Sequence, residues 1–132
     1  MKGSCLCGAI EVIAPEHSEV SLCHCNMCRK WSSGAFHALH GGQDIQFIGA
    51  EPKRYRSSEW AERGFCGECG THLFYHLLVN DEYVLSAGLF ALPDAKLTLE
   101  IFTDEKPEYY ALHQDSQKMT GREVFEQFAP KE

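Results

Sequence analysis

Seven cysteines occur in three short clusters, and they are the residues of this sequence best suited to chemistry. Two cysteines separated by one or two residues can direct both sulfurs at one tetrahedral metal ion, whereas a Cys-x-Cys pair is badly placed for a disulfide. An odd number of cysteines also rules out complete internal pairing. The pattern therefore indicates metal binding by the clusters Cys5-Leu6-Cys7, Cys23-His24-Cys25-Asn26-Met27-Cys28 and Cys66-Gly67-Glu68-Cys69.

Seven thiolates divide naturally into four and three. Four sulfurs close the coordination shell of one zinc ion, and the two-sulfur clusters Cys5/Cys7 and Cys66/Cys69 are the natural partners for such a structural site. Each has a glycine directly after its second cysteine, Gly8 and Gly70, which suits a tight turn with positive φ. A redox dithiol is the alternative interpretation of Cys66/Cys69, but no βαβ pattern surrounds it.

The central cluster can supply three sulfurs by itself. A zinc ion held by Cys23, Cys25 and Cys28 keeps one coordination position free, which distinguishes catalytic from structural zinc. We therefore predict that any catalysis takes place there. A closed second site, with His24 or another histidine as fourth ligand, remains an alternative. Because a residue between two ligating cysteines tends to point away from the metal, His24 could instead support the ligands or face solvent.

The other histidines give weaker indications. His72 and His76 have the four-residue spacing of helical metal ligands, but the residues between them favour a strand and the glutamate of a metalloprotease motif is missing. We interpret them as packed or surface residues. His37 and His40 could transfer a proton, although the sequence sets no distance between them and the cysteines.

Composition restricts the partners of the chain. The 132 residues include 19 acidic and 12 basic side chains, for a formal net charge of -7, so we expect no nucleic-acid partner. The small basic groups Arg29-Lys30 and Lys53–Arg56 are interpreted as surface charge that could attract a small anionic substrate. The N-terminus lacks a signal-peptide pattern and no apolar run is long enough for a membrane span. We therefore expect a cytoplasmic protein without a membrane partner, and leave its oligomeric state open.

Most of the chain has the pattern of short strands separated by turn residues, so the fold class is predicted to be mainly β. A single domain over residues 1–132 is expected. Thr120 and Glu123 form a capping-box pattern that predicts a short C-terminal helix, and a helical turn is expected over Met27–Trp31. Residues 130–132 are expected to fray. Strands are expected at 9–14, 20–23, 35–39, 45–48, 53–56, 71–78, 83–87 and 97–102, with a hairpin turn at 79–82.

The three clusters in their sequence context resemble the glutathione-dependent formaldehyde-activating enzyme family, also called the CENP-V/GFA domain. The resemblance rests on all seven cysteines and extends over nearly the whole chain. Its motifs are Ser4-Cys5-Leu6-Cys7-Gly8, Cys23-His24-Cys25-Asn26-Met27-Cys28-Arg29-Lys30, Phe65-Cys66-Gly67-Glu68-Cys69-Gly70-Thr71, and the segment from Ile101 to Pro107 followed by Tyr109-Tyr110.

This resemblance implies an Mss4-like fold of short coiled β-sheets around zinc knuckles. It also implies two zinc ions, one structural on Cys5, Cys7, Cys66 and Cys69 and one catalytic on Cys23, Cys25 and Cys28. The implied activity is that of a carbon-sulfur lyase, which joins a thiol such as glutathione to an aldehyde such as formaldehyde and yields an S-hydroxymethyl adduct. A zinc-stabilised β domain that binds a partner or buffers metal is the alternative function.

Overall fold

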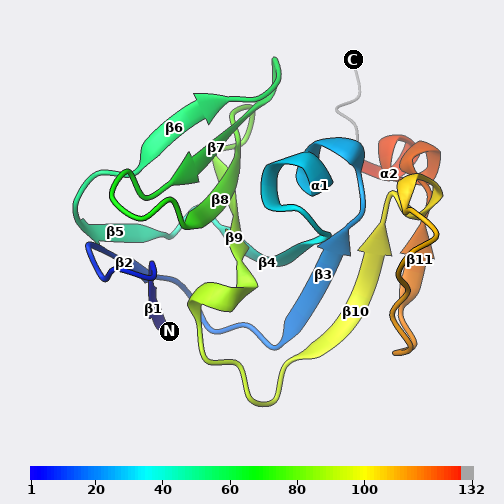
Figure 1. Cartoon of the computed structure of the whole chain (residues 1–132), viewed down its shortest axis with the longest axis horizontal. Coiled ribbons are helices and arrows are strands. Elements are labelled where there is room, and N and C mark those ends of the chain that lie inside the picture. The colour runs from blue at the N-terminus through cyan, green and yellow to red at the C-terminus, as the bar shows by residue number, and fades with distance from the viewer. Residues whose placement is uncertain (129–132) are drawn as a thin grey trace. The chain divides into compact units, whose positions relative to one another are not determined.

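The computed structural model describes residues 1–128 and contains two compact units. The first unit combines residues 1–18 with residues 39–94, and the second combines residues 19–38 with the described residues from 95 onward. Strand β4 (Phe36–Gly42) passes from the second unit into the first. The mainly β fold that the sequence predicts is confirmed (Figure 1).

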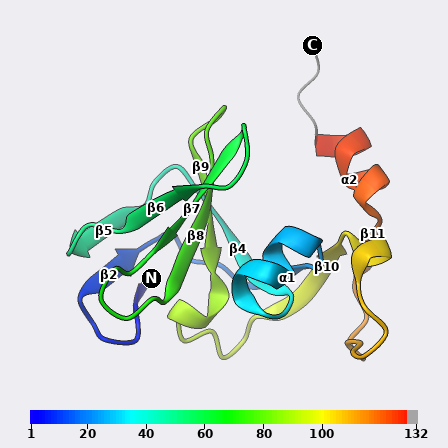
Figure 2. The same cartoon turned by 45° about the horizontal axis from the view of Figure 1, so that its top comes forward.

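The first unit consists of short antiparallel strands joined by tight turns. Strand β2 lies between β1 and β5 in one sheet, and β6 to β9 pair in chain order (Figure 2). Each of the two-cysteine clusters forms the turn of a hairpin, β1–β2 for Cys5/Cys7 and β7–β8 for Cys66/Cys69. The strands are β1 Lys2–Ser4, β2 Ile10–Ile13, β5 Gln46–Gly49, β6 Lys53–Arg56, β7 Ala61–Phe65, β8 His72–Leu77 and β9 Glu82–Ser86, followed by the 3-10 turn η1 Ala87–Leu89.

The second unit contains mainly parallel strands. Strand β10 (Lys96–Ile101) pairs in parallel with β3 (Glu19–Cys23) on one side and with β11 (Gln117–Met119) on the other, as Figure 1 shows, and β4 pairs antiparallel with β3. Helix α1 (Asn26–Ser32) follows β3 directly, a 3-10 turn η2 (Thr103–Glu105) follows β10, and helix α2 (Gly121–Phe128) follows β11.

Both predicted helices are present. At the start of α2 the backbone N–H of Glu123 donates to Thr120 Oγ1 over 3.2 Å, and the N–H of Thr120 donates to Glu123 Oε1 over 3.0 Å. These reciprocal bonds are the capping box that the sequence predicts. Neither α-helix within residues 1–128 has the length and apolar character that crossing a bilayer requires. The predicted fraying of residues 130–132 lies outside the described residues.

The predicted strands are confirmed with shifts at their ends, whereas β1, β7 and β11 were not predicted. Strand β7 lacks an apolar pattern because Glu62, Arg63 and Gly64 occupy its centre. Arg63 is nevertheless buried, and its guanidinium carbon lies 5.0 Å from the centre of the Tyr75 ring. Packing of a charged side chain over an aromatic neighbour thus replaces the alternation on which strand prediction depends.

The apolar core of the first unit surrounds Phe74 on β8. Its ring is fully buried and lies 5.1 Å from the Phe47 ring and 5.0 Å from the Tyr83 ring, measured between centres. The ring packs directly over Gly64 of the neighbouring strand, where a Cβ atom would lie 2.1 Å from two ring carbons. Glycine is therefore required at this position by the close approach of an aromatic side chain.

We expect Gly64→Ala to lower the free energy of unfolding by about 1 to 3 kcal/mol, because the added methyl group must displace the Phe74 ring in a packed core. Gly88→Ala is the matched control, since a Cβ there meets no atom within 4 Å. Urea denaturation of both variants measures the effect. Equal stability of the two variants would contradict the packing seen at Gly64.

Candidate metal centres

The first cluster brings together four sulfurs from two hairpin turns of the first unit. The Sγ atoms of Cys5, Cys7, Cys66 and Cys69 all lie within 4.8 Å of one another. The distance is 3.7 Å from Cys5 Sγ to Cys7 Sγ and 3.8 Å from Cys7 Sγ to Cys66 Sγ. Tetrahedral zinc with bonds of about 2.3 Å to sulfur places its ligands about 3.8 Å apart. The donor set therefore fits one zinc ion, as the sequence grouping predicted.

The two turns have the same local structure. The backbone N–H of Cys5 donates to the carbonyl of Ile10, five residues later, and that of Cys66 donates to the carbonyl of Thr71. Gly8 and Gly70 both have φ of +80°, the positive value that the sequence predicts for these positions. A Cβ at either glycine would meet no atom within 4 Å, so glycine is favoured there by backbone conformation and not by space.

Thr71 connects the two turns. Its Oγ1 accepts the backbone N–H of Leu6 over 3.1 Å and lies 3.1 Å from Cys69 Sγ, to which its hydroxyl donates. The hydroxyl and the N–H of Thr71 lower the pKa of Cys69 to about 5. At Cys7 the N–H of Ala9 favours the thiolate, but the three neighbouring sulfurs and burial together outweigh it and raise the pKa of Cys7 to about 12. Four sulfurs held this closely repel one another once ionised, and a cation offsets that repulsion.

The second cluster is formed within the second unit where β3 ends and α1 begins. Cys23 is the last residue of β3, Cys25 is the N-cap of α1, and Cys28 lies buried in its first turn. Their three Sγ atoms lie within 4.8 Å of one another. The helix thus converts the spacing of the sequence into three sulfurs that converge on one point, as predicted.

The helix start favours ionised sulfur at Cys25. The Cys28 N–H donates to Cys25 Sγ over 3.4 Å. Hydrogen bonds from the thiols of Cys23 and Cys28, together with the amides at the helix start, lower the pKa of Cys25 to about 2. The pKa of Cys23 is raised, because its thiol donates to Cys25 and because burial and the neighbouring charges oppose a further thiolate. This cluster too is a donor set that a divalent cation would stabilise.

His24 does not point its ring at the cluster. The side chain is fully buried, with Nε2 at 2.8 Å from Glu100 Oε1 and Nδ1 at 2.7 Å from Tyr110 Oη. Both ring nitrogens are therefore engaged, and the alternative in which His24 is the fourth ligand does not hold in this geometry. The alternative that it supports the ligands fits, since its backbone lies between Cys23 and Cys25.

The other candidate histidines lie outside both clusters. His72 and His76 lie on strand β8, as predicted, so their four-residue spacing is not that of metal ligands on a helix. His76 Nε2 lies 2.6 Å from Asp81 Oδ1, and His72 Nε2 donates to the carbonyl of Phe74 over 3.0 Å. His37 is exposed and its Nδ1 donates to the carbonyl of Ala35 over 2.9 Å. The proton-transfer role suggested for His37 and His40 stays a prediction.

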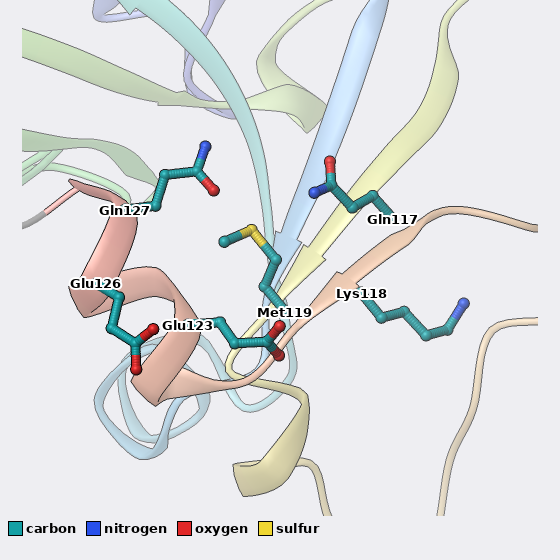
Figure 3. A pocket seen from close by; sticks show the side chains of 6 residues that line it. All are labelled: Gln117, Lys118, Met119, Glu123, Glu126 and Gln127. Carbon is teal, nitrogen blue, oxygen red and sulfur yellow. The ribbon is translucent and has the colours of Figure 1, made fainter.

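A shallow hollow in the second unit lies between β11 and α2. Figure 3 shows side chains from both elements around it, with the Met119 side chain extending between them. Its lining is mostly amide and charged groups and contains no cysteine, so it offers none of the chemistry of the sulfur clusters. The lining residues are Gln117, Lys118, Met119, Glu123, Glu126 and Gln127.

Comparison with known proteins agrees with this arrangement of sulfurs. Residues 1–105 match the family model described as "Glutathione-dependent formaldehyde-activating enzyme". This chain belongs to that family. All seven cysteines of both clusters lie within the matched residues. The family resemblance recognised in the sequence is therefore confirmed.

Two further similarities extend over most of the chain. A protein of Schizosaccharomyces pombe named "uncharacterized lyase" is 34% identical over 127 residues, covering 93% of each chain. A crystal structure of a Rhodobacter sphaeroides protein aligns with a TM-score of 0.59 at 22% identity, covering 74% of this chain and 100% of that one. The first match is a relative that is named a lyase, and the second match shows a shared fold.

Sequence reasoning did not find the residues that surround His24. Glu100 and Tyr110 are separated from His24 by 76 and 86 positions, so no local spacing connects them. A faint signal exists for Glu100, which is an acidic residue within the otherwise apolar end of β10. Tyr110 was noted only as part of an aromatic pair typical of this family. Their convergence is visible only in the folded chain.

We expect Thr71→Val to weaken zinc binding by about 10- to 100-fold, because it removes both the donor to Cys69 and the acceptor for the Leu6 N–H. Thr71→Ser is the matched control, since it keeps the hydroxyl. Competition with a chromophoric chelator measures the affinity. Equal affinities for the Val and Ser variants would show that the hydroxyl does not support this cluster.

Proposed function

We propose that this chain is a zinc-dependent carbon-sulfur lyase that joins a small thiol of the glutathione type to an aldehyde of the formaldehyde type. The product would be an S-hydroxymethyl adduct. The observation that carries the proposal is the convergence of three sulfurs at a helix start, those of Cys23, Cys25 and Cys28. Family membership and a relative named a lyase support the same reaction class.

The two clusters would hold zinc for different purposes. Cys5, Cys7, Cys66 and Cys69 would bind a structural ion, because four sulfurs complete a tetrahedral shell. Cys23, Cys25 and Cys28 would bind a second ion and supply only three ligands. Zinc bound there would provide Lewis acidity, which favours the thiolate form of a substrate thiol or polarises an aldehyde oxygen.

The residues of the second cluster contribute position and charge. Burial of Cys28 and the pairing of β3 with β10 fix the sulfurs in place. The Asn26 N–H donates to Glu105 Oε1 over 2.8 Å, which satisfies a free amide at the start of α1. Arg29 donates from Nε to the carbonyl of His24 over 2.9 Å and places a positive charge beside the cluster. That charge would favour an anionic thiol substrate.

Exchange spectroscopy by NMR tests the enzyme function directly. Zinc-loaded wild type is expected to accelerate the exchange of formaldehyde with glutathione, and Cys25→Ser is expected to bind about one zinc ion less per chain and to lose that acceleration. Zinc content is measured on the same samples. A fully loaded wild type without acceleration would sink the enzyme proposal for this substrate pair and favour the binding or metal-buffering alternative.

The structural assignment predicts unequal effects of two equivalent substitutions. Cys66→Ser should lower the free energy of unfolding by several kcal/mol, because the first cluster joins sulfurs 59 positions apart at Cys7 and Cys66. Cys28→Ser changes an equally buried thiol but opens only a short local loop, so we expect a smaller loss. Thermal denaturation of the zinc-loaded variants compares them. Similar losses in both would show that the roles of the clusters are misassigned.

A further inference from the structure

The segment that follows β10 is bonded to the cysteine segment of the second cluster at two points. The backbone N–H of His24 donates to the carbonyl of Ile101 over 3.0 Å. The backbone N–H of Asn26 donates to Glu105 Oε1 over 2.8 Å. These two amides flank Cys25 in the chain, so the segment after β10 holds the backbone on both sides of a metal-ligand candidate.

The start of α1 uses Glu105 to complete its hydrogen bonding. The first four amides of a helix have no partner inside the helix. Cys25, the N-cap residue, accepts three of them, two through its sulfur and one through its carbonyl. The three donors are the N–H groups of Met27, Cys28 and Arg29. An N-cap side chain reaches the second and third amides but not the first, so Glu105 accepts the one amide, that of Asn26, that Cys25 leaves over.

Glu105 reaches this amide because the chain turns sharply after β10. Phe102 has φ of +54°, in the left-handed region where a residue with a bulky side chain is strained. The 3-10 turn η2 follows, and the N–H of Glu105 donates to the Phe102 carbonyl over 3.0 Å. Such a conformation persists only where surrounding contacts hold it, and it is often found at functional sites.

Contacts with α2 hold the turn. The Phe102 ring lies 5.8 Å from the Phe125 ring between centres, at an interplanar angle of 88°. A Cβ atom at Gly121 would lie 2.7 Å from a Phe102 ring carbon, so the start of α2 packs directly on that ring. The Gly121 N–H donates to Asp104 Oδ1 over 2.6 Å. Two adjacent carboxylates of η2 therefore bind the starts of two different helices, Asp104 that of α2 and Glu105 that of α1.

We propose that Glu105 is a positioning residue of the second cluster, whose carboxylate holds the peptide between Cys25 and Asn26 in the orientation that lets the three sulfurs converge. Without this bond the first turn of α1, which carries Cys28, is less ordered before metal binds. Ordering it then costs part of the binding free energy. This inference rests on the proposed function in one respect, namely that the second cluster binds a metal ion.

Three variants separate the hydrogen bond of Glu105 from its charge. A negative charge near a metal site attracts a cation even without a bond. Glu105→Gln keeps an acceptor oxygen and removes the charge, whereas Glu105→Ala removes both. Asp104→Ala is the matched control, because that neighbouring carboxylate binds the start of α2 and not that of α1.

Competition for zinc with a chromophoric chelator measures the affinity of each cluster, and the second cluster is identified as the site lost in Cys25→Ser. We expect Glu105→Ala to weaken zinc binding there about tenfold and Glu105→Gln to stay within about threefold of the wild type, as one helix-start acceptor allows. Asp104→Ala should leave this affinity unchanged. The affinity of the first cluster should be the same in all variants.

Cadmium-113 NMR of fully loaded protein tests the geometry of the cluster independently of affinity. Each cluster gives its own signal, and we expect Glu105→Ala to shift only the signal that Cys25→Ser abolishes. A residue that merely stabilises the fold would not move this signal at full loading. An unmoved signal with unchanged affinity in Glu105→Ala would overturn the proposal. So would an equal loss in Asp104→Ala, or a Glu105→Gln variant as weak as Glu105→Ala.

Measuring the exchange of formaldehyde with glutathione on the same samples separates this inference from the proposed function. A wild type without acceleration, combined with the expected loss of affinity in Glu105→Ala, overturns the proposed function and leaves the role of Glu105 standing. A wild type that accelerates the exchange, combined with unchanged affinity and an unmoved signal in Glu105→Ala, overturns the role of Glu105 alone.

Discussion

The first unit depends on the contact between two hairpin turns through four sulfurs. The β1–β2 turn carries Cys5 and Cys7, and the β7–β8 turn carries Cys66 and Cys69. The β1–β2 hairpin is too short to be stable alone, since β1 has three residues and β2 has four. Sulfurs about 3.8 Å apart repel once they are ionised, so a cation bound among them would stabilise the whole arrangement. In such small strands, metal binding and folding are coupled.

The second cluster is formed by a single local segment and not by two distant turns. Its three sulfurs come from six consecutive residues, and the transition from β3 to α1 is sufficient to bring them together. Little chain entropy is lost by closing so short a loop, so a metal ion there contributes less to the stability of the fold. A site of this kind can offer an unsaturated ion without endangering the fold. The two clusters thus separate stability from chemistry.

Buried polar groups give the second cluster its specific surroundings. His24 lies between two cysteines in the sequence, yet its ring faces Glu100 and Tyr110. The contact between His24 and Glu100 is buried, and Ser116 and Lys118 satisfy the other carboxylate oxygen. Such a network is worth its desolvation cost only when every member is paired. Here both ring nitrogens of His24 have a partner.

The sequence by itself determined the grouping of the sulfurs, because ligand spacing, tight-turn glycines and a helix start are local properties. Gly8, Gly70 and the Thr120 capping box acted as local signals and were confirmed. Strand β7 was missed because Arg63 and Gly64 suit it only through contacts with Tyr75 and Phe74 on the next strand. Only the tertiary structure decided which groups His24 contacts. Its hydrogen-bond partners are 76 and 86 positions away, and no local sequence pattern connects residues so far apart.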